Sequence, residues 1–232
     1  MKYKHFFFDL DGTLCESREA IGLDVAGALA LLERMGADTI IVSGAEKQRI
    51  EQQLGNNSVK YLMAQCGSDT PFWKKKLTER DEIEVRRHIA LIQKRLKYDW
   101  GYGSGDERFV ENRGSQITFS LTGFDCDHKF KKDFDPDTRR RQVILKEIPF
   151  FSLNLECKIA GTTSLDYNHK EYTKGKNIKR FIDHLGWRRE DCIYFGDRFF
   201  PGGNDETVMG VIDCVVVSGP KDFLEKLQKY TQ

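Results

Sequence analysis

The sequence predicts an α/β protein with a Rossmann-like core that contains a parallel sheet and is interrupted by an inserted α+β domain with an antiparallel sheet. Two observations lead to this prediction. Before residue 82 and after residue 168, short apolar strands alternate with helical segments, as in βαβ units. Between them, the order becomes helix, strand, strand, helix, strand, strand, which a parallel array does not produce. We therefore expect a core over 1–81 and 169–232 and an insert over 82–168.

The first core strand ends in two carboxylates. The aromatic run Phe6–Phe8 is short and apolar, as in a strand buried on both faces, and Asp9 and Asp11 follow it closely. Gly12 then allows the backbone to turn sharply. The other expected core elements are helices over 21–35, 46–54 and 177–185, strands over 39–42, 60–64, 192–195 and 214–217, and a short C-terminal helix.

The insert opens with a long amphipathic helix over 81–100, whose buried stripe we expect at Ile83, Ile89, Ile92 and Leu96. Strands over 108–111, 116–121, 152–159 and 163–167 follow, with a helix over 135–148 between the second and the third. The run Arg139–Arg141 on that helix could bind phosphate, but we expect a solvated helix face.

Composition argues against several classes of function. The net charge is +1 with 31% charged residues, which does not suit a general nucleic-acid binder. No apolar run approaches the roughly 20 residues of a membrane span, and the first strand begins too early for a signal peptide. The six cysteines are scattered without a C-x-x-C pair, so we expect reduced thiols in a cytoplasmic protein rather than a zinc site, although a disulfide stays open.

Polar residues follow three of the expected strands, at the edge where ligands bind in open α/β sheets. Asp9 and Asp11 follow the first strand. Ser43 follows the second, and Asp197 a later one. Two neighbouring carboxylates repel unless they share a cation or a proton, and a hard ion such as Mg²⁺ would relieve the repulsion. Taken alone, these features have plainer explanations: an Asp-Gly turn for Asp9, an N-cap for Ser43 and a helix-flanking surface lysine for Lys174.

Four separated motifs together resemble the haloacid dehalogenase superfamily of phosphotransferases. They are Asp9–Thr13 at a strand end, Ser43-Gly44 after a strand, Lys174-Gly175 before a helix, and Gly196–Asp205 with its Pro-Gly-Gly insertion. The resemblance covers the whole core. The last motif is most similar to that of the eukaryotic-type phosphomannomutases, and the order of elements in the insert resembles the C2b-type cap domain of the Cof-like subfamily IIB.

The resemblance implies an aspartyl-phosphate mechanism. Asp9 would attack phosphorus, and Asp11 would protonate the leaving oxygen and later deprotonate the incoming one. Ser43, with Gly44 beside it, would hold a phosphate oxygen, and Lys174 would offset negative charge. The implied cofactor is Mg²⁺, held by Asp9, the backbone carbonyl of Asp11 and Asp197, with Asp205 in support.

Four further residues match substrate-binding positions of the phosphomannomutases. Arg18 lies in the loop after the first strand, and its plainer alternative is a solvated surface charge. Arg113, Ser164 and Asp166 lie in the cap, which the resemblance places over the nucleophile when it closes. The implied partner is a small phosphorylated metabolite, such as a sugar phosphate, and we expect neither nucleic acid nor membrane. The oligomeric state is left open.

Two departures from the phosphomannomutase pattern bear on the reaction. Where those proteins carry two more cap arginines, this chain has Phe124 and Lys131, and lysine lacks the bidentate fork of arginine. The third strand also ends in Ala64–Ser68 rather than in Glu-Asn-Gly. We therefore expect a Mg²⁺-dependent phosphatase that uses water as the final acceptor. The alternatives are a phosphomannomutase-like mutase and an inactive binding module, and the intact motifs disfavour the latter.

Overall fold

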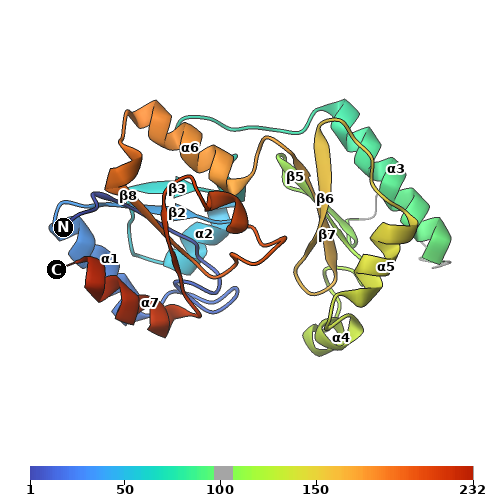
Figure 1. The fold of residues 1–232 in the computed structure, drawn as a ribbon. Coiled ribbons are helices and arrows are strands. Elements are labelled where there is room, and N and C mark those ends of the chain that lie inside the picture. Colours follow the sequence, from blue (N-terminus) through green and yellow to red (C-terminus); the bar gives the residue numbers. More distant parts are fainter. Residues whose placement is uncertain (97–106, 232) are drawn as a thin grey trace. The chain divides into compact units, whose positions relative to one another are not determined.

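The computed structural model describes residues 1–96 and 107–231, which form two compact units (Figure 1). The first unit consists of Met1–Lys74 and Tyr172–Gln232, and the second of Lys75–Glu171. The sequence predicted these boundaries after residues 81 and 168, seven residues later and three residues earlier than in the structure. We call the first unit the core and the second the cap.

In the described part of the core, five strands form one parallel sheet in the order β3-β2-β1-β8-β9. The strands are β1 (His5–Phe8), β2 (Asp38–Val42), β3 (Tyr61–Met63), β8 (Cys192–Gly196) and β9 (Asp213–Val216). The central strand, β1, pairs with β2 on one side and β8 on the other, with Phe8 opposite Ile41 and Phe195. This order brings the carboxyl ends of β1, β2 and β8 to one edge of the sheet.

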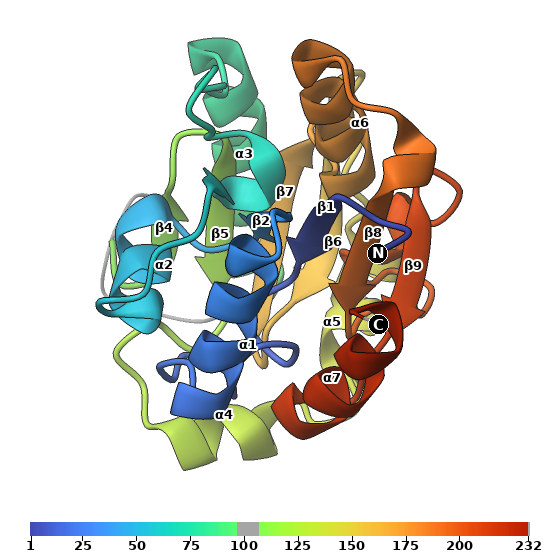
Figure 2. The same ribbon diagram turned by 90° about the vertical axis from the view of Figure 1, so that its left-hand side faces the viewer.

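Both faces of the core sheet are buried, which explains the continuous aromatic run of β1. Phe6 and Phe8 pack with helices α1 (Leu23–Arg34), α2 (Lys47–Leu54) and α7 (Pro220–Leu227). Phe7 points to the other face, against α6 (Lys174–Leu185). Figure 1 shows α6 on the opposite side of the sheet from α1 and α7, and Figure 2 shows α1 and α7 side by side.

Four strands of the described cap residues form an antiparallel sheet in the order β4-β5-β7-β6. The cap elements are α3 (Glu79–Leu96), β4 (Val110–Asn112), β5 (Gln116–Ser120), α4 (His128–Phe134), α5 (Arg139–Glu147), β6 (Leu155–Ala160) and β7 (Ser164–His169). Ile117, Phe119 and Leu165 pack with the buried side of α3. Thr118 and Asp166 alternate with them and lie on the other face of the sheet. The predicted fold class, a parallel core with an antiparallel insert, is confirmed.

Several local expectations for the cap were wrong. Ile83 is 44% exposed, because the buried stripe of α3 runs through Val85, His88, Ile89 and Ile92. The part of the expected helix beyond residue 96 lies outside the described residues. The structure also contains α4, which has few apolar residues and was not predicted.

In the core, short 3₁₀ turns lie at Gln65–Gly67, Arg189–Asp191, Glu206–Val208 and Gln228–Tyr230.

Arg141 is buried, contrary to the expected solvated helix face. Its guanidinium lies 2.6 Å from an oxygen of Asp135, which is also buried. It also donates to the carbonyls of Ala160, Gly161 and Ser164, at 2.7, 3.1 and 3.2 Å. Because the guanidinium is already engaged by these groups, Arg141 fixes the turn between β6 and β7 and is not available to phosphate.

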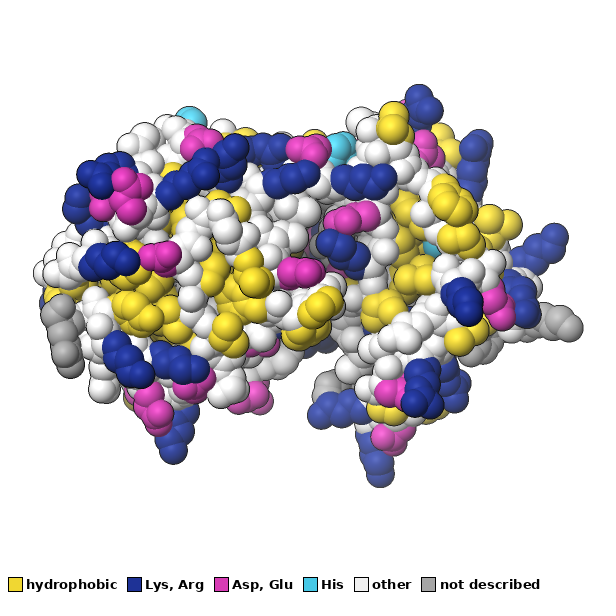
Figure 3. Space-filling model, in the orientation of Figure 1, with side chains coloured by type: hydrophobic (Ala, Val, Ile, Leu, Met, Phe, Trp, Pro, Cys, Tyr) yellow, Lys and Arg dark blue, Asp and Glu magenta, His cyan; other side chains and the backbone are white. Residues whose placement is uncertain are grey.

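The visible surface carries charges of both signs, and the cysteine side chains are thiols. On the face shown in Figure 3, Lys and Arg side chains lie among Asp and Glu side chains. Within residues 1–96 and 107–231, no helix is long and apolar enough to cross a bilayer. The six cysteines, all among the described residues, are free thiols.

The buried His88 predicts a pH-dependent stability of the cap. Its Nε2 must donate to the Ile148 carbonyl at 2.8 Å, so its Nδ1 accepts the Tyr167 hydroxyl proton, also at 2.8 Å. Burial lowers the pKa of His88 below 6.5. The unfolded chain therefore binds a proton that the folded chain does not, and the free energy of unfolding should fall as the pH drops through about 6.5.

His88→Gln should remove that contribution. Chemical denaturation between pH 7.5 and about 5 measures it as the difference between wild type and variant. A difference that stays constant over this range would contradict the prediction.

Candidate active site

The site begins where β1 and β8 end side by side. The Asp9 backbone N–H donates to the Phe195 carbonyl at 2.9 Å, which holds Asp9 against the end of β8. Gly12 has φ +84°, and a Cβ atom there would lie 2.5 Å from an oxygen of Asp197. Glycine at residue 12 therefore lets the loop after β1 approach the Asp197 carboxylate, although the two segments are far apart in sequence.

A buried lysine joins three oxygen-bearing side chains. Lys174, in the first turn of α6, is 1% exposed. Its Nζ lies 2.8 Å from Asp9 Oδ1, 2.6 Å from Asp205 Oδ1 and 2.9 Å from the Tyr194 hydroxyl. An ammonium group has three protons, so each proton has one acceptor. Lys174 is therefore not the helix-flanking surface lysine of the plainer explanation.

Asp205 has donors on both carboxylate oxygens. Oδ1 accepts from Lys174 and from the Tyr194 hydroxyl at 2.6 Å, and Oδ2 accepts from the Arg198 backbone N–H at 2.9 Å. A Cβ atom on Gly196 would lie 2.5 Å from Oδ2, so only glycine permits this approach. The loop between β8 and Asp205 is thus folded around one buried carboxylate.

The charges of this cluster depend on one another. Burial raises the pKa of Asp9 to about 7, although the Lys174 charge opposes the shift. Burial alone would lower the pKa of Lys174, but Asp205 and Asp9 outweigh it and raise that pKa. Burial would likewise raise the pKa of Asp205, but the charge and hydrogen bond of Lys174 lower it. Both directions favour the charged forms, so Lys174 and Asp205 are an ion pair beside Asp9.

The acidic residues also fit a cation. One carboxylate oxygen each from Asp9, Asp197 and Asp205 lies within 4.8 Å of the others. Asp197 Oδ1 is buried and has no hydrogen-bond partner among the described residues. Carboxylate oxygens are the ligands that Mg²⁺ prefers, and a bound cation would satisfy this oxygen. Since donors occupy both oxygens of Asp205, Asp9 and Asp197 are the available direct ligands, with Asp205 in support.

Asp11 is held by three donors. Its Oδ1 accepts from the Arg18 backbone N–H at 2.7 Å and from Gln53 Nε2 at 3.0 Å, and its Oδ2 accepts from Arg49 Nη2 at 3.0 Å. The backbone of Arg18, rather than its guanidinium, makes this contact. We did not anticipate Arg49 and Gln53. Their spacing of four residues on α2, which places them on one helix face, was the available signal.

Ser43 lies at the carboxyl end of β2, next to β1. Its hydroxyl accepts from the Ala45 backbone N–H at 3.1 Å and so closes a turn, while the N-cap of α2 is Glu46. The N-cap explanation for Ser43 is therefore wrong. A Cβ atom on Gly44 would meet only Cys66 Sγ within 4 Å, at 3.7 Å. Among the described atoms, little therefore lies against Gly44.

The predicted cap residues share one face of the cap sheet. Glu111 pairs with Thr118, and Thr118 with Asp166, so the three form a row across the strands. Arg113 Nε donates to Glu111 at 2.9 Å, and Thr118 Oγ1 donates to Asp166 at 2.8 Å. Burial raises the pKa of Asp166, and Thr118 and the Arg113 charge oppose the shift. Ser164 lies two residues before Asp166 on the same face.

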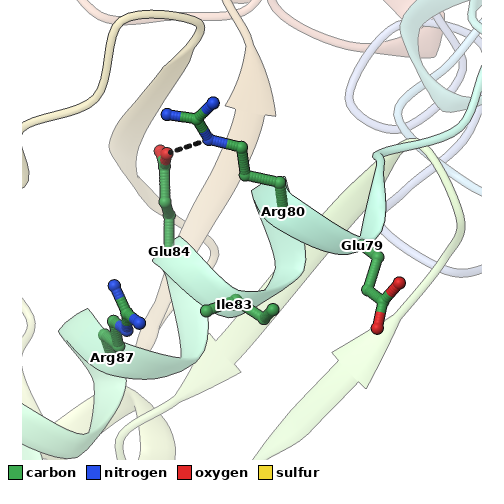
Figure 4. A pocket seen from close by; sticks show the side chains of 5 residues that line it. All are labelled: Glu79, Arg80, Ile83, Glu84 and Arg87. Atoms are coloured by element: carbon green, nitrogen blue, oxygen red, sulfur yellow. Dashed lines mark ion pairs between the residues drawn. The ribbon is translucent and has the colours of Figure 1, made fainter.

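A separate hollow of about 550 Å³ lies along α3 (Figure 4). It is lined by Glu79, Arg80, Ile83, Glu84 and Arg87. Arg80 and Glu84 pair across one helical turn at 3.5 Å. This hollow contains none of the candidate site residues, and we assign it no role.

Sequence relatives cover nearly the whole chain. The phosphomannomutase of Babesia bovis is 25% identical over 236 residues, which span 96% of this chain and 95% of that protein. The phosphomannomutase of Encephalitozoon cuniculi is 27% identical, and human phosphomannomutase 1 is 24% identical. These two cover 97% and 96% of this chain and 92% and 90% of their own length. No protein-family model matches the chain.

Solved structures share the fold. A sugar phosphatase of haloacid dehalogenase subclass IIB superposes with a TM-score of 0.62 at 19% identity, over 98% of both chains. A haloalkanoate-superfamily phosphatase from Bacteroides thetaiotaomicron gives 0.63 at 13% identity, over 99% of this chain and 95% of that one. The chain is an enzyme with the fold of the haloacid dehalogenase phosphatases. Its sequence is similar to the phosphomannomutases, and its fold is similar to that of the subclass IIB sugar phosphatase.

The buried Lys174 gives a direct test of the assigned ion pair. Lys174→Met should abolish activity and lower the free energy of unfolding by about 3–5 kcal/mol, because it leaves two buried carboxylates without their cation. Lys179→Met is the matched control, since Lys179 is exposed on the same helix, and it should change stability by about 0.5 kcal/mol or less. Denaturant unfolding at neutral pH measures both, and equal stability of the two variants would contradict the assigned ion pair.

Proposed function

We propose that the chain is a Mg²⁺-dependent phosphotransferase that acts on a sugar phosphate through an aspartyl-phosphate on Asp9. One observation carries this proposal: the Lys174 ammonium is buried between Asp9 and Asp205, at 2.8 and 2.6 Å. A buried carboxylate beside a fixed cation is suited to attack an anionic phosphorus centre, because the cation offsets the accumulated negative charge.

In the first step, a carboxylate oxygen of Asp9 bonds to phosphorus while the bond from phosphorus to the sugar oxygen breaks. Asp11 gives its proton to that leaving oxygen. In the second step, Asp11 takes a proton from the acceptor hydroxyl, whose oxygen bonds to phosphorus while the Asp9–phosphorus bond breaks. Lys174 offsets charge in both steps, and Ser43 with Gly44 binds a phosphate oxygen. Mg²⁺, held by Asp9, the Asp11 carbonyl and Asp197, would neutralise phosphoryl charge.

The acceptor distinguishes a mutase from a phosphatase. The names of the sequence relatives favour a phosphomannomutase-like mutase over the phosphatase that the sequence departures suggested. We therefore propose a sugar hydroxyl as the acceptor. In this proposal Arg18, Arg113, Ser164 and Asp166 bind the sugar phosphate.

The free thiols suit a reducing compartment, and we propose the cytoplasm.

One observation favours hydrolysis as the second candidate. Lys131 Nζ donates to the Phe124 carbonyl at 2.7 Å, so the two residues that replace phosphomannomutase cap arginines contact each other. An apolar ring and an ammonium bound to a carbonyl make a weak second phosphate site. A mutase must hold a bisphosphorylated sugar by either phosphate, whereas a phosphatase needs one phosphate site only.

The nucleophile and the metal can be tested together. Asp9→Asn keeps the shape of the side chain but removes its negative charge, so turnover should fall by a factor on the order of 10³ or more. Asp183→Asn, on the exposed side of α6, is the control and should keep wild-type activity. Release or transfer of phosphate from sugar phosphates should also stop in EDTA and return with Mg²⁺. Substantial turnover by Asp9→Asn would refute the covalent mechanism.

Product analysis separates the two acceptors. With mannose 6-phosphate, Mg²⁺ and a hexose 1,6-bisphosphate, ³¹P NMR should show mannose 1-phosphate forming faster than inorganic phosphate. Phe124→Arg combined with Lys131→Arg should raise the ratio of isomer to free phosphate further, because arginine binds phosphate through two hydrogen bonds. Faster release of inorganic phosphate by the wild type would establish the second candidate instead.

A further inference from the structure

Tyr194 is a buried polar residue of β8 that the motifs do not include. Its side chain is fully buried. Among the described residues, the Lys174 ammonium donates to Asp9, Asp205 and Tyr194. Its hydroxyl accepts from Lys174 at 2.9 Å and donates to Asp205 Oδ1 at 2.6 Å. The phenol thus uses both its proton and a lone pair inside the cluster.

The geometry points to Tyr194 as a positioning residue that fixes the Lys174 ammonium against the nucleophile Asp9. This inference rests on the proposed phosphoryl transfer through Asp9. The three acceptors around Nζ determine how the ammonium is oriented, and the Tyr194 oxygen is the only uncharged one of the three. With that acceptor present, each Lys174 proton has a hydrogen bond, and a rotation of the ammonium away from Asp9 would break at least one of them.

The hydroxyl also limits how strongly Asp205 attracts Lys174. Asp205 Oδ1 shares its negative charge between the Tyr194 proton and Lys174, and Oδ2 is occupied by the Arg198 N–H. If the hydroxyl is removed, Asp205 loses one donor and Lys174 loses one acceptor. The ammonium should then be drawn toward Asp205 and away from Asp9, because the ion pair becomes the dominant interaction in a dry site.

The alternative is that Tyr194 only fills the core. Its ring packs edge-on against Phe199, with centroids 6.0 Å apart, so some loss of stability is expected in either case. Tyr167 in the cap sheet provides a matched control, since it is also fully buried and its hydroxyl also has a partner, His88. Removal of that hydroxyl affects a buried hydrogen bond of the second unit and none in the cluster.

Tyr194→Phe and Tyr167→Phe should therefore be compared by steady-state kinetics with the sugar phosphate at saturating Mg²⁺. Tyr194→Phe should lower kcat about tenfold and change KM less than twofold, because the lost hydrogen bond acts on the nucleophile rather than on the sugar. Tyr167→Phe should leave both constants unchanged. Wild-type kcat in Tyr194→Phe, with stability lowered as in Tyr167→Phe, would overturn the inference.

Calorimetry gives a readout that does not need turnover. Beryllofluoride with Mg²⁺ forms a phosphoryl-like adduct on aspartate, and Tyr194→Phe should bind it about tenfold more weakly than wild type. If wild type neither turns over phosphate esters nor binds this adduct, the proposed function fails. If wild type does both and Tyr194→Phe matches it, only the role of Tyr194 fails.

A second variant covers the case in which Tyr194→Phe does not fold. 4-Aminophenylalanine at residue 194 keeps the ring and a donor for Asp205 but is a poor acceptor for Lys174. It should show the same loss of kcat, and unchanged kcat in a folded variant would overturn the inference.

Discussion

The Lys174 ammonium, buried between Asp9 and Asp205, is the interaction on which the rest of the site depends. Charged groups leave water at a large cost in free energy unless partners replace the lost hydration. Here the ammonium has three oxygen acceptors, and Asp205 has donors on both oxygens. The lysine thereby holds Asp9 at the sheet edge, and negative charge is still in excess because Asp197 lies beside the pair. That excess is what a divalent cation would balance.

The parallel topology makes this cluster possible. Because β1 lies between β2 and β8, segments that follow residues 8, 42 and 196 emerge at one edge, and α6 begins there with Lys174. Two glycines then permit close approach: Gly12 to Asp197 and Gly196 to Asp205. A side chain at either glycine would displace a carboxylate of the acidic cluster. The arrangement of charged side chains therefore depends both on the strand order and on glycine at residues 12 and 196.

In the proposed function, the final acceptor depends on the cap rather than on the core. Both candidate reactions use the same nucleophile, acid/base residue and lysine, so the core is compatible with either. They differ in whether a second phosphate can be held. Arg113 is paired with Glu111, and Lys131 contacts the Phe124 carbonyl. In this proposal, a second phosphate would have to compete with these two contacts.

The fold class, the strand-end carboxylates and the candidate roles of Asp9 and Lys174 could be predicted from the sequence. Buried strands and motif spacing are local signals, since each depends on a few neighbouring residues. The expected solvation of Arg141 and the expected burial of Ile83 show where local signals failed. A side chain's burial depends on what packs against it from distant segments: Asp135 and three carbonyls around Arg141, or Asp9 and Asp205 around Lys174. In the sequence, Tyr194 is one residue of an apolar strand, and nothing near it indicates a partner for its hydroxyl. Only the tertiary structure brings that hydroxyl to the Lys174 ammonium, because residues 9, 174, 194 and 205 meet through packing and are far apart in sequence.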